Sequence, residues 1–179
     1  MKTGKDITSI YNLYVDDLFT YGTYLGYNRE VVKDAIHDLF LKFSDDKNIL
    51  NDVSNIKFYL FRSLRNRLLD MYKYQKEHVS LNEYFAVEMQ FNIQVNVEDL
   101  IIEKEEQMQI KAEIEQMLNT LTDRQREIIY LRYIQEYDYN QISELLQINV
   151  HSCRKLVSKA ICSLREKLGF LITLLTLLS

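Results

Sequence analysis

In this 179-residue chain, the residues whose types and spacing suggest a function are cationic and aromatic. Residues 57–76 hold six Lys or Arg against one acid, and residues 151–167 hold five against one. Lys and Arg attract nucleic-acid phosphates regardless of sequence, and aromatic rings offer unpaired bases a stacking surface worth about 1–3 kcal/mol per base. The two basic segments therefore favour nucleic-acid binding, although solvated surface charge would explain either one alone. Their basic residues are Lys57, Arg62, Arg65, Arg67, Lys73 and Lys76 in the first segment, and Arg154, Lys155, Lys159, Arg165 and Lys167 in the second.

Charge along the chain is uneven. The net charge of −4 and the sequence pI of about 5.5 do not indicate a nucleic-acid binder when the chain is taken as a whole. Between the two basic segments, however, residues 77–106 hold eight acids against Lys104 alone. Such a polyanionic stretch could lie in channels built for nucleic acid, or it could be a solvated tether.

Enzyme chemistry has little support in the sequence. Only four glycines and no proline occur, so there is no glycine-rich phosphate loop. Cys153 and Cys162 are nine residues apart, about 13.5 Å along a helix, and cannot bridge each other there. With three scattered histidines they match no zinc spacing, and they suit a reducing cytosol. We expect no enzyme, no metal site and no cofactor.

Hydrophobic periodicity predicts an all-α chain. Apolar residues recur at three- and four-residue steps, while residues 77–97 lack this period. The helix at 54–75 is predicted to bury Leu60, Leu64 and Leu68 and to carry aromatics, Phe61 among them, on its other faces. The sequence thus predicts two small helical domains, 1–76 and 107–179, joined by an acidic linker at 77–106. Helices are expected over 8–27, 29–43, 54–75, 97–119, 123–135 and 138–147, and after a turn at 148–150.

The last two of these helices form a helix-turn-helix pattern, in which a short helix and a tight turn precede a longer basic helix. A second helix of this kind can enter the major groove and present its first side chains to base edges. Asn149 suits the N-cap of that helix, whereas a glycine is common where Gln147 stands, since a left-handed Gln costs roughly 1 kcal/mol. A three-helix bundle with a solvated basic side is the alternative. The candidate DNA contacts are His151, Ser152, Arg154, Lys155 and Lys159.

A family resemblance rests on these residues. Residues 118–168 resemble the C-terminal DNA-binding domain of bacterial sigma-70 family factors, most closely the extracytoplasmic-function (ECF) group. The matching points include Leu121-Thr122, Arg126-Glu127, Gln141 to Glu144, Ser152 to Arg154 and Lys159-Ala160. Independently, residues 34–43 resemble the segment that grips RNA polymerase core, and residues 59–76 the segment that melts and reads the −10 promoter element. The two blocks stand in the family's order.

The resemblance implies a transcription initiation factor that performs no covalent chemistry. It implies binding to RNA polymerase core, through the β′ clamp helices and the β flap, and to promoter DNA, in the cytoplasm, with an anti-sigma factor as a further partner. The loop at 44–56 would form the pocket for a flipped base. Asn66 and Asp70 could instead orient arginines. By resemblance, Asp34, His37 and Asp38 face the polymerase; Lys57, Tyr59, Arg62, Arg65, Asn66, Arg67, Asp70, Tyr72 and Lys73 hold the −10 region; and His151, Ser152, Arg154, Lys155 and Lys159 hold the −35 region.

Two other functions stay open at this stage. A stand-alone helix-turn-helix regulator would bind duplex DNA as a dimer, but would not need the 34–76 block. A sigma-like adaptor would keep the fold and be brought to DNA by another factor. The apolar end, 170–178, is about half as long as a bilayer span, so membrane insertion is not expected; it could pack on the domain or form a partner patch. The polar N-terminus predicts no signal peptide.

Overall fold

The computed structural model describes residues 6–46, 49–50, 53–78, 91–93 and 104–178, without side chains for 75–78, 105 and 169–178. All regular structure in these ranges is helical, as predicted. Contacts divide the chain into two compact units, residues 1–90 and 91–179. Among the described residues, no helix combines the length and apolar character needed to cross a membrane.

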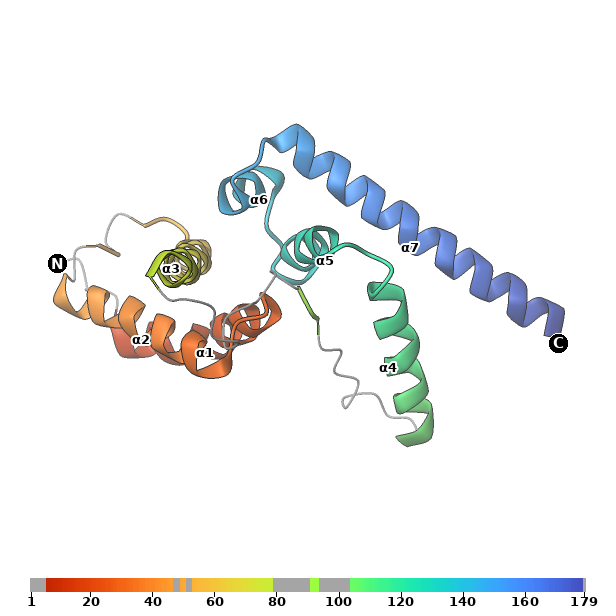
Figure 1. Ribbon diagram of the computed structural model, residues 1–179, viewed down its shortest axis with the longest axis horizontal. Helices are drawn as coiled ribbons and strands as arrows, with labels where there is room; N and C mark the ends of the chain where they lie inside the picture. The colour runs from red at the N-terminus through yellow and green to blue at the C-terminus, as the bar shows by residue number, and fades with distance from the viewer. Residues whose placement is uncertain (1–5, 47–48, 51–52, 79–90, 94–103, 179) are drawn as a thin grey trace. The chain divides into compact units, whose positions relative to one another are not determined.

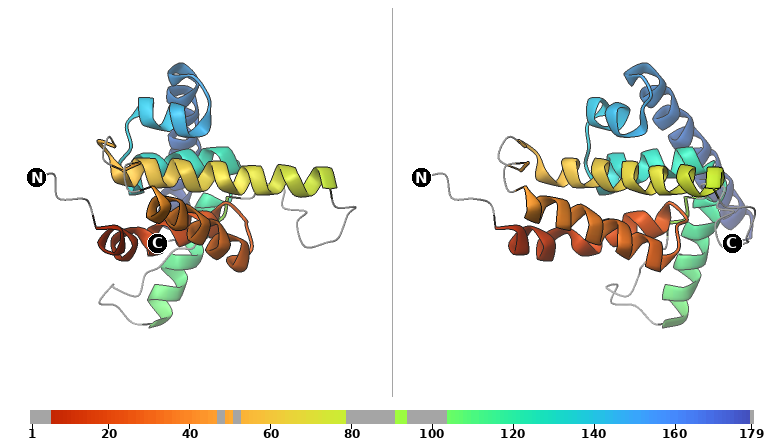
Figure 2. Two further views of the ribbon diagram at one scale, coloured as in Figure 1. Left: turned by 90° about the vertical axis from the view of Figure 1, so that its left-hand side faces the viewer. Right: turned by 60° about the vertical axis from the view of Figure 1, so that its left-hand side comes forward.

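The front unit is built from three helices, α1 (Ile7–Tyr24), α2 (Arg29–Asp45) and α3 (Ile56–His78). Each contacts the other two, and α1 and α2 lie side by side (Figure 1; Figure 2). Asp6 caps α1 by accepting from the amides of Thr8 and Ser9, and Asn28 caps α2 by accepting from the amide of Glu30. These caps satisfy amides that have no partner within the helix, so each helix begins at a defined residue.

The core of the front unit follows the predicted period. Leu60, Leu64 and Leu68 are fully buried on α3. Phe61 is also fully buried, with its ring centroid 5.0 Å from that of Tyr21, so its expected place among the outer aromatics is wrong. Tyr59, Leu60 and Phe61 are consecutive, so the sequence does not show which of the two rings is buried. In the structure it is the ring of Phe61, which lies next to Tyr21 of α1.

The rear unit contains α4 (Lys104–Leu118), α5 (Asp123–Ile129), a π-helical turn η1 (Tyr130–Ile134), α6 (Tyr139–Leu146) and α7 (Val150–Leu178). Helix α7 contacts α4, α5 and α6 (Figure 1). A capping box joins Thr122 and Gln125 at the start of α5, as predicted, and a second one joins Asp138 and Gln141 at the start of α6. These caps fix where the two short helices begin.

The predicted helix at 123–135 differs in its second half. It leaves the α-helical pattern after Ile129, and the amide of Gln135 donates to the carbonyl of Tyr130 at 3.0 Å, five residues back. Glu136 follows with a positive φ of 59°. Tyr133 and Ile134 of this wide turn are 54% and 64% exposed.

The predicted linker, 77–106, falls largely outside the described residues. Helix α3 continues to His78, α4 begins at Lys104, and Phe91 is buried in the rear unit. The boundaries 1–76, 77–106 and 107–179 therefore stay a prediction. Backbone of the apolar end continues α7 to Leu178, but its side chains are not described, so its role also stays a prediction.

Candidate nucleic-acid interface

The helix-turn-helix forms around a left-handed turn. Gln147 ends α6 with φ 54° and ψ 44°, and the amide of Ile148 donates to the carbonyl of Ser143 at 3.0 Å. This six-residue closure is the usual way in which a helix ends at a left-handed residue, here without the glycine that normally occupies it. Asn149 then accepts a hydrogen bond from the amide of Ser152 at 2.8 Å, so it caps α7 as predicted.

The first turns of α7 have one buried and one exposed face. Cys153, Val157 and Ala160 are buried against the rest of the unit. The predicted DNA contacts lie on the other face and are exposed, apart from the half-buried Ser152. The geometry therefore leaves cations free to meet a groove at the start of this helix, where a recognition helix uses them. The exposed residues are His151, Arg154, Lys155 and Lys159.

Tyr139 links α7 to the turn before α6. Its ring centroid lies 5.6 Å from Cζ of Arg154 and 5.0 Å from Cζ of Arg132. Arg132 also donates from Nη1 to the carbonyl of Tyr137 at 2.8 Å. Cations so close to an aromatic face are held by cation–π attraction. The predicted site residues did not include Arg132 and Tyr139, although both are among the positions that carry the sigma-70 resemblance.

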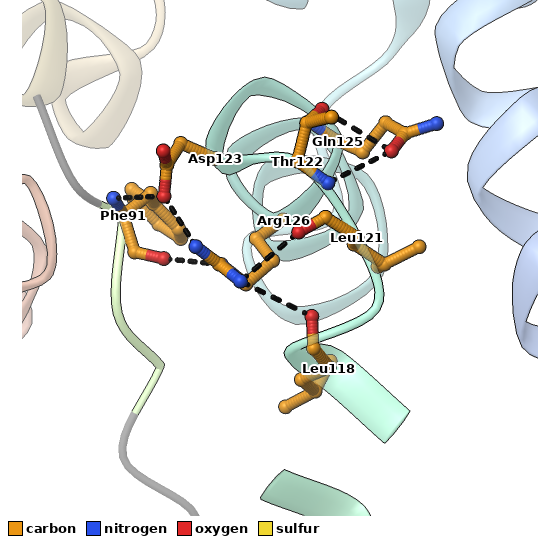
Figure 3. Close-up of polar contacts among 7 residues, drawn as sticks. All are labelled: Phe91, Leu118, Leu121, Thr122, Asp123, Gln125 and Arg126. Atoms are coloured by element: carbon orange, nitrogen blue, oxygen red, sulfur yellow. Dashed lines mark hydrogen bonds and ion pairs between the residues drawn. The ribbon is translucent and has the colours of Figure 1, made fainter. Parts of the chain in front are cut away.

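Two other arginines of the rear unit are structural. Arg124 donates to the carbonyl of Leu146 at 2.8 Å and pairs with the buried Glu127 at 3.1 Å, which fixes the end of α6 against α5. Arg126, 11% exposed, donates to three backbone carbonyls, those of Phe91, Leu118 and Leu121, and pairs with Asp123 (Figure 3). Both guanidinium groups are engaged within the unit, so neither is added to the candidate DNA contacts.

The predicted −10 residues of the front unit lie along α3. Lys57 pairs with Asp17 of α1 at 3.4 Å. Arg65 is only 4% exposed, so it is not the surface cation that the sequence analysis expected. It lies four residues after the fully buried Phe61, on the same side of α3, so it is covered together with that ring. Exposed members are Arg62, Arg67, Asp70 and Lys73, and partly exposed members are Lys57, Tyr59, Asn66 and Tyr72.

An open pocket of about 630 Å³ lies between α2 and α3. Four predicted −10 residues line it from α3, at helical spacing along one face: Tyr59, Asn66, Arg67 and Asp70. Asp38, predicted to bind polymerase, lines the same pocket from α2 and pairs with Arg67 at 2.5 Å. Asp34 and His37 are exposed on α2 outside the pocket lining. Of the loop at 44–56, Asp45 reaches the pocket; residues 47–48 and 51–52 lie outside the described residues.

Among the described residues, neither a metal-binding cluster nor a reactive thiol belongs to this candidate interface. No group of three or more His, Cys, Asp or Glu there could hold a metal ion. Cys153 is buried and Cys162 exposed, and both are free thiols. Burial raises the pKa of the Cys153 thiol, against an opposing effect of the Arg124 charge. A buried, protonated thiol acts as a small apolar residue.

Fold and site together define an all-helical protein of two units, the rear one a helix-turn-helix module with a basic recognition helix. Comparison with known families places residues 111–161, which include α5, η1, α6 and the start of α7, in the family described as "Sigma-70, region 4". The rear unit is thus similar to region 4 of sigma-70 factors.

Known relatives extend the likeness beyond the rear unit. The chain is 20% identical to "ECF RNA polymerase sigma factor SigM" of Bacillus subtilis (strain 168) over 154 residues, which are 86% of this chain and 90% of that protein. Its fold is similar to that of the sigma factor RpoE, solved with the anti-sigma factor NepR from Bartonella quintana, with a TM-score of 0.59, 22% identity, and coverage of 92% of this chain and 98% of that chain. It is also similar to CnrH, solved with the cytosolic domain of CnrY, with a TM-score of 0.51, 16% identity, and coverage of 91% and 87%.

Proposed function

We propose that this protein is an ECF-type sigma factor, which binds RNA polymerase core, directs it to promoters and assists promoter melting. The observation that carries the proposal is the pocket between α2 and α3, where Asp38 and the α3 residues meet on one surface. A stand-alone regulator that binds duplex DNA has no need of such a surface. Similarity to sigma factors supports a role without covalent chemistry, carried out in the cytoplasm where the polymerase works.

Each unit has its own part in this proposal. Asp34, His37 and Asp38 of α2 contact the β′ clamp helices, while the polar and aromatic residues of α3 hold single-stranded DNA of the −10 region by phosphate contacts and stacking. The exposed cations of α7, with Arg132, hold duplex DNA of the −35 region, and the rear unit also meets the β flap. Arg65 is excluded from these contacts because it is buried.

A protein inhibitor is a further proposed partner. Two proteins of similar fold were solved with protein partners, the sigma factor RpoE with the anti-sigma factor NepR and CnrH with the cytosolic domain of CnrY. Exposed apolar side chains offer contacts of the kind that partners use, namely Leu13 and Leu41 in the front unit and Tyr133 and Ile134 in the rear unit.

Run-off transcription tests the function directly. Core polymerase with this protein, on a library of promoters, is expected to give specific transcripts that core polymerase alone does not give. Tight binding of the purified protein to duplex DNA without core would favour the stand-alone regulator instead. Core binding without any promoter preference would favour the adaptor. Arg154→Ala should weaken upstream promoter contact, and unchanged transcription would contradict the groove assignment.

A further inference from the structure

Phe91 precedes α4 in the chain and is nevertheless held by α5 (Figure 3). Its amide donates to Oδ1 of Asp123 at 3.0 Å, and its carbonyl accepts from Nε of Arg126 at 2.6 Å. Only 2% of the residue is exposed, and its ring centroid lies 5.6 Å from that of Tyr130. Phe91 is therefore fixed through its backbone, and its ring packs against the ring of Tyr130.

Tyr130 begins the π-helical turn η1 and connects its two ends. The amide of Gln135 donates to the carbonyl of Tyr130 at 3.0 Å, and Nε2 of Gln135 donates to the hydroxyl of Tyr130 at 2.7 Å. Both residues are buried, with 4% and 7% of their surface exposed. Because the backbone and the side chain of Tyr130 hold the same partner, a shift of the Tyr130 ring would also move the far end of the turn.

The conformation of this turn is unfavourable and needs support from its surroundings. π-Helical geometry is rare in proteins, and Glu136 at its end has a positive φ of 59°, which residues with a Cβ avoid. Oε1 of Gln135 is buried and accepts no hydrogen bond from the described residues, which adds a further cost. Strained backbone of this kind persists only where the surrounding structure fixes it. The contact of Phe91 with Tyr130 comes from outside the turn and supplies part of that support.

The same turn carries Arg132, a cation of the candidate interface. Nη1 of Arg132 donates to the carbonyl of Tyr137 at 2.8 Å, and its Cζ lies 5.0 Å from the ring centroid of Tyr139. Arg154 of α7 has its Cζ 5.6 Å from the same ring centroid. A cation of the turn and a cation of the recognition helix thus meet at one aromatic ring, so the conformation of the turn determines where Arg132 lies.

We propose that Phe91 is a positioning residue for the binding of duplex DNA by the rear unit, an inference that rests on the proposed function. By packing on Tyr130, Phe91 holds the π-helical turn in the form that places Arg132 at the ring it shares with Arg154. Phe91 itself does not touch DNA in this role. Loss of its ring lets the turn relax and moves Arg132 away, which removes about one phosphate contact while α7 keeps its own.

Phe91→Ala tests this role, with the exposed neighbour Asn92→Ala as its matched control. The full-length protein is assembled with core polymerase, and its affinity for an upstream promoter fragment is measured from about 50 to 200 mM salt. Phe91→Ala should weaken binding about two- to tenfold. The slope of log K against log salt concentration should become shallower by about 0.9, the value for one lost phosphate contact. Asn92→Ala should change neither quantity.

A double-variant cycle separates positioning from general destabilisation. Arg132→Gln should give the same loss of affinity and the same slope as Phe91→Ala, and the double variant should bind little more weakly than either. A residue that only stabilised the fold would lower the active fraction, which titration measures, and would leave the slope unchanged. Losses that multiply in the double variant, or an unchanged slope in Phe91→Ala, would overturn the positioning role.

Phe91→Leu keeps the proposal testable if Phe91→Ala does not fold. Leucine fills much of the space of the ring, so the loss of affinity should be smaller than for alanine and should again disappear on the Arg132→Gln background. A loss that persists on that background would refute the inference. Failure of the unaltered holoenzyme to bind the fragment would instead overturn the proposed function.

Discussion

Asp38 on α2 and Arg67 on α3 form an ion pair between two predicted binding surfaces. Oδ2 of Asp38 accepts from Nη2 of Arg67 at 2.5 Å and from Nε at 3.2 Å. Their side chains are 43% and 48% exposed, so a large partner can reach either one. Exposed pairs contribute about 0.2–1 kcal/mol. Polymerase that engages Asp38 would free Arg67 for DNA, and the two affinities would be coupled by at most about fivefold.

Reversing the charge at position 38 should impair polymerase binding. Asp38→Lys places a cation where the proposed docking surface is acidic, and we expect the affinity for core polymerase to fall about tenfold or more, equivalent to about 1.4 kcal/mol. Fluorescence titration of labelled protein with core polymerase measures this. Normal co-purification with core would contradict the docking role.

A charge swap separates docking from folding. Asp38→Lys combined with Arg67→Asp can re-form an ion pair across α2 and α3, so thermal stability should return while core affinity stays low. Asp16→Lys, a reversal at an exposed acid of α1, serves as the matched control and should leave core affinity unchanged. Recovery of core binding in the double variant would show that Asp38 acts only through its pair.

Replacing Arg65 should lower the free energy of unfolding more than replacing Arg62. Arg65 is 4% exposed, and Arg65→Ala should lower the free energy of unfolding by about 1–3 kcal/mol because it removes a buried, partnered side chain. The exposed Arg62→Ala should stay within about 0.5 kcal/mol and weaken promoter melting instead. Urea unfolding followed by circular dichroism measures the first effect. Equal stabilities of the two variants would place Arg65 on the surface after all.

Local signals in the sequence were enough for much of the fold. The capping box at Thr122 and the N-cap at Asn149 are each formed by residues three positions apart, so sequence alone predicts them. The same holds for the three-and-four spacing of the buried leucines of α3. Features that depend on distant partners were not predictable. Phe91 contacts residues more than thirty positions away. Arg62 and Arg65 are both arginines of one basic segment, yet only Arg65 is buried.

The site was predicted in part for the same reason. Exposure of the cations of α7 follows from the period of its buried face, which the sequence displays. The Tyr139 contacts with Arg132 and Arg154 depend on the π-helical turn, where the chain departs from the helical pattern that its residues suggest. Pairing of Asp38 with Arg67, 29 residues apart, depends on how α2 and α3 pack.

Tyr139 is expected to act as a positioning residue for Arg154. Cation–π contacts at exposed sites contribute about 0.5–1 kcal/mol, so Tyr139→Leu should weaken binding of the holoenzyme to an upstream promoter fragment about two- to fivefold. Tyr139→Phe keeps the aromatic face and should bind nearly normally. On an Arg154→Ala background, Tyr139→Leu should add little. A full additional loss in that double variant would mean that the two residues act independently.

The two thiols should differ in reactivity and in their effect on stability. Cys162 is exposed and should react with a thiol reagent in the native protein, whereas Cys153 should react only after unfolding. Because burial raises the folded-state pKa of Cys153, its contribution to stability is complete below the unfolded-state pKa of about 8.5–9 and is lost as the pH rises toward the folded value. Stability should therefore fall above about pH 9, and less so in Cys153→Ala. Two reactive thiols in the native protein would contradict the burial.

Replacing Gln147 by glycine should stabilise the rear unit. Gln147 holds φ 54° and ψ 44° at the end of α6, a conformation that costs a residue with a Cβ about 1–2 kcal/mol and costs glycine little. Glycine also loses more freedom on folding, so the expected net gain is about 0.5–1 kcal/mol. Thermal unfolding of Gln147→Gly and Gln147→Ala measures it, with alanine expected to give no gain because it keeps the Cβ. Since Gln147 is exposed and precedes the recognition helix, promoter binding should be retained in Gln147→Gly. Equal melting temperatures for the glycine and alanine variants would contradict a left-handed residue at this turn.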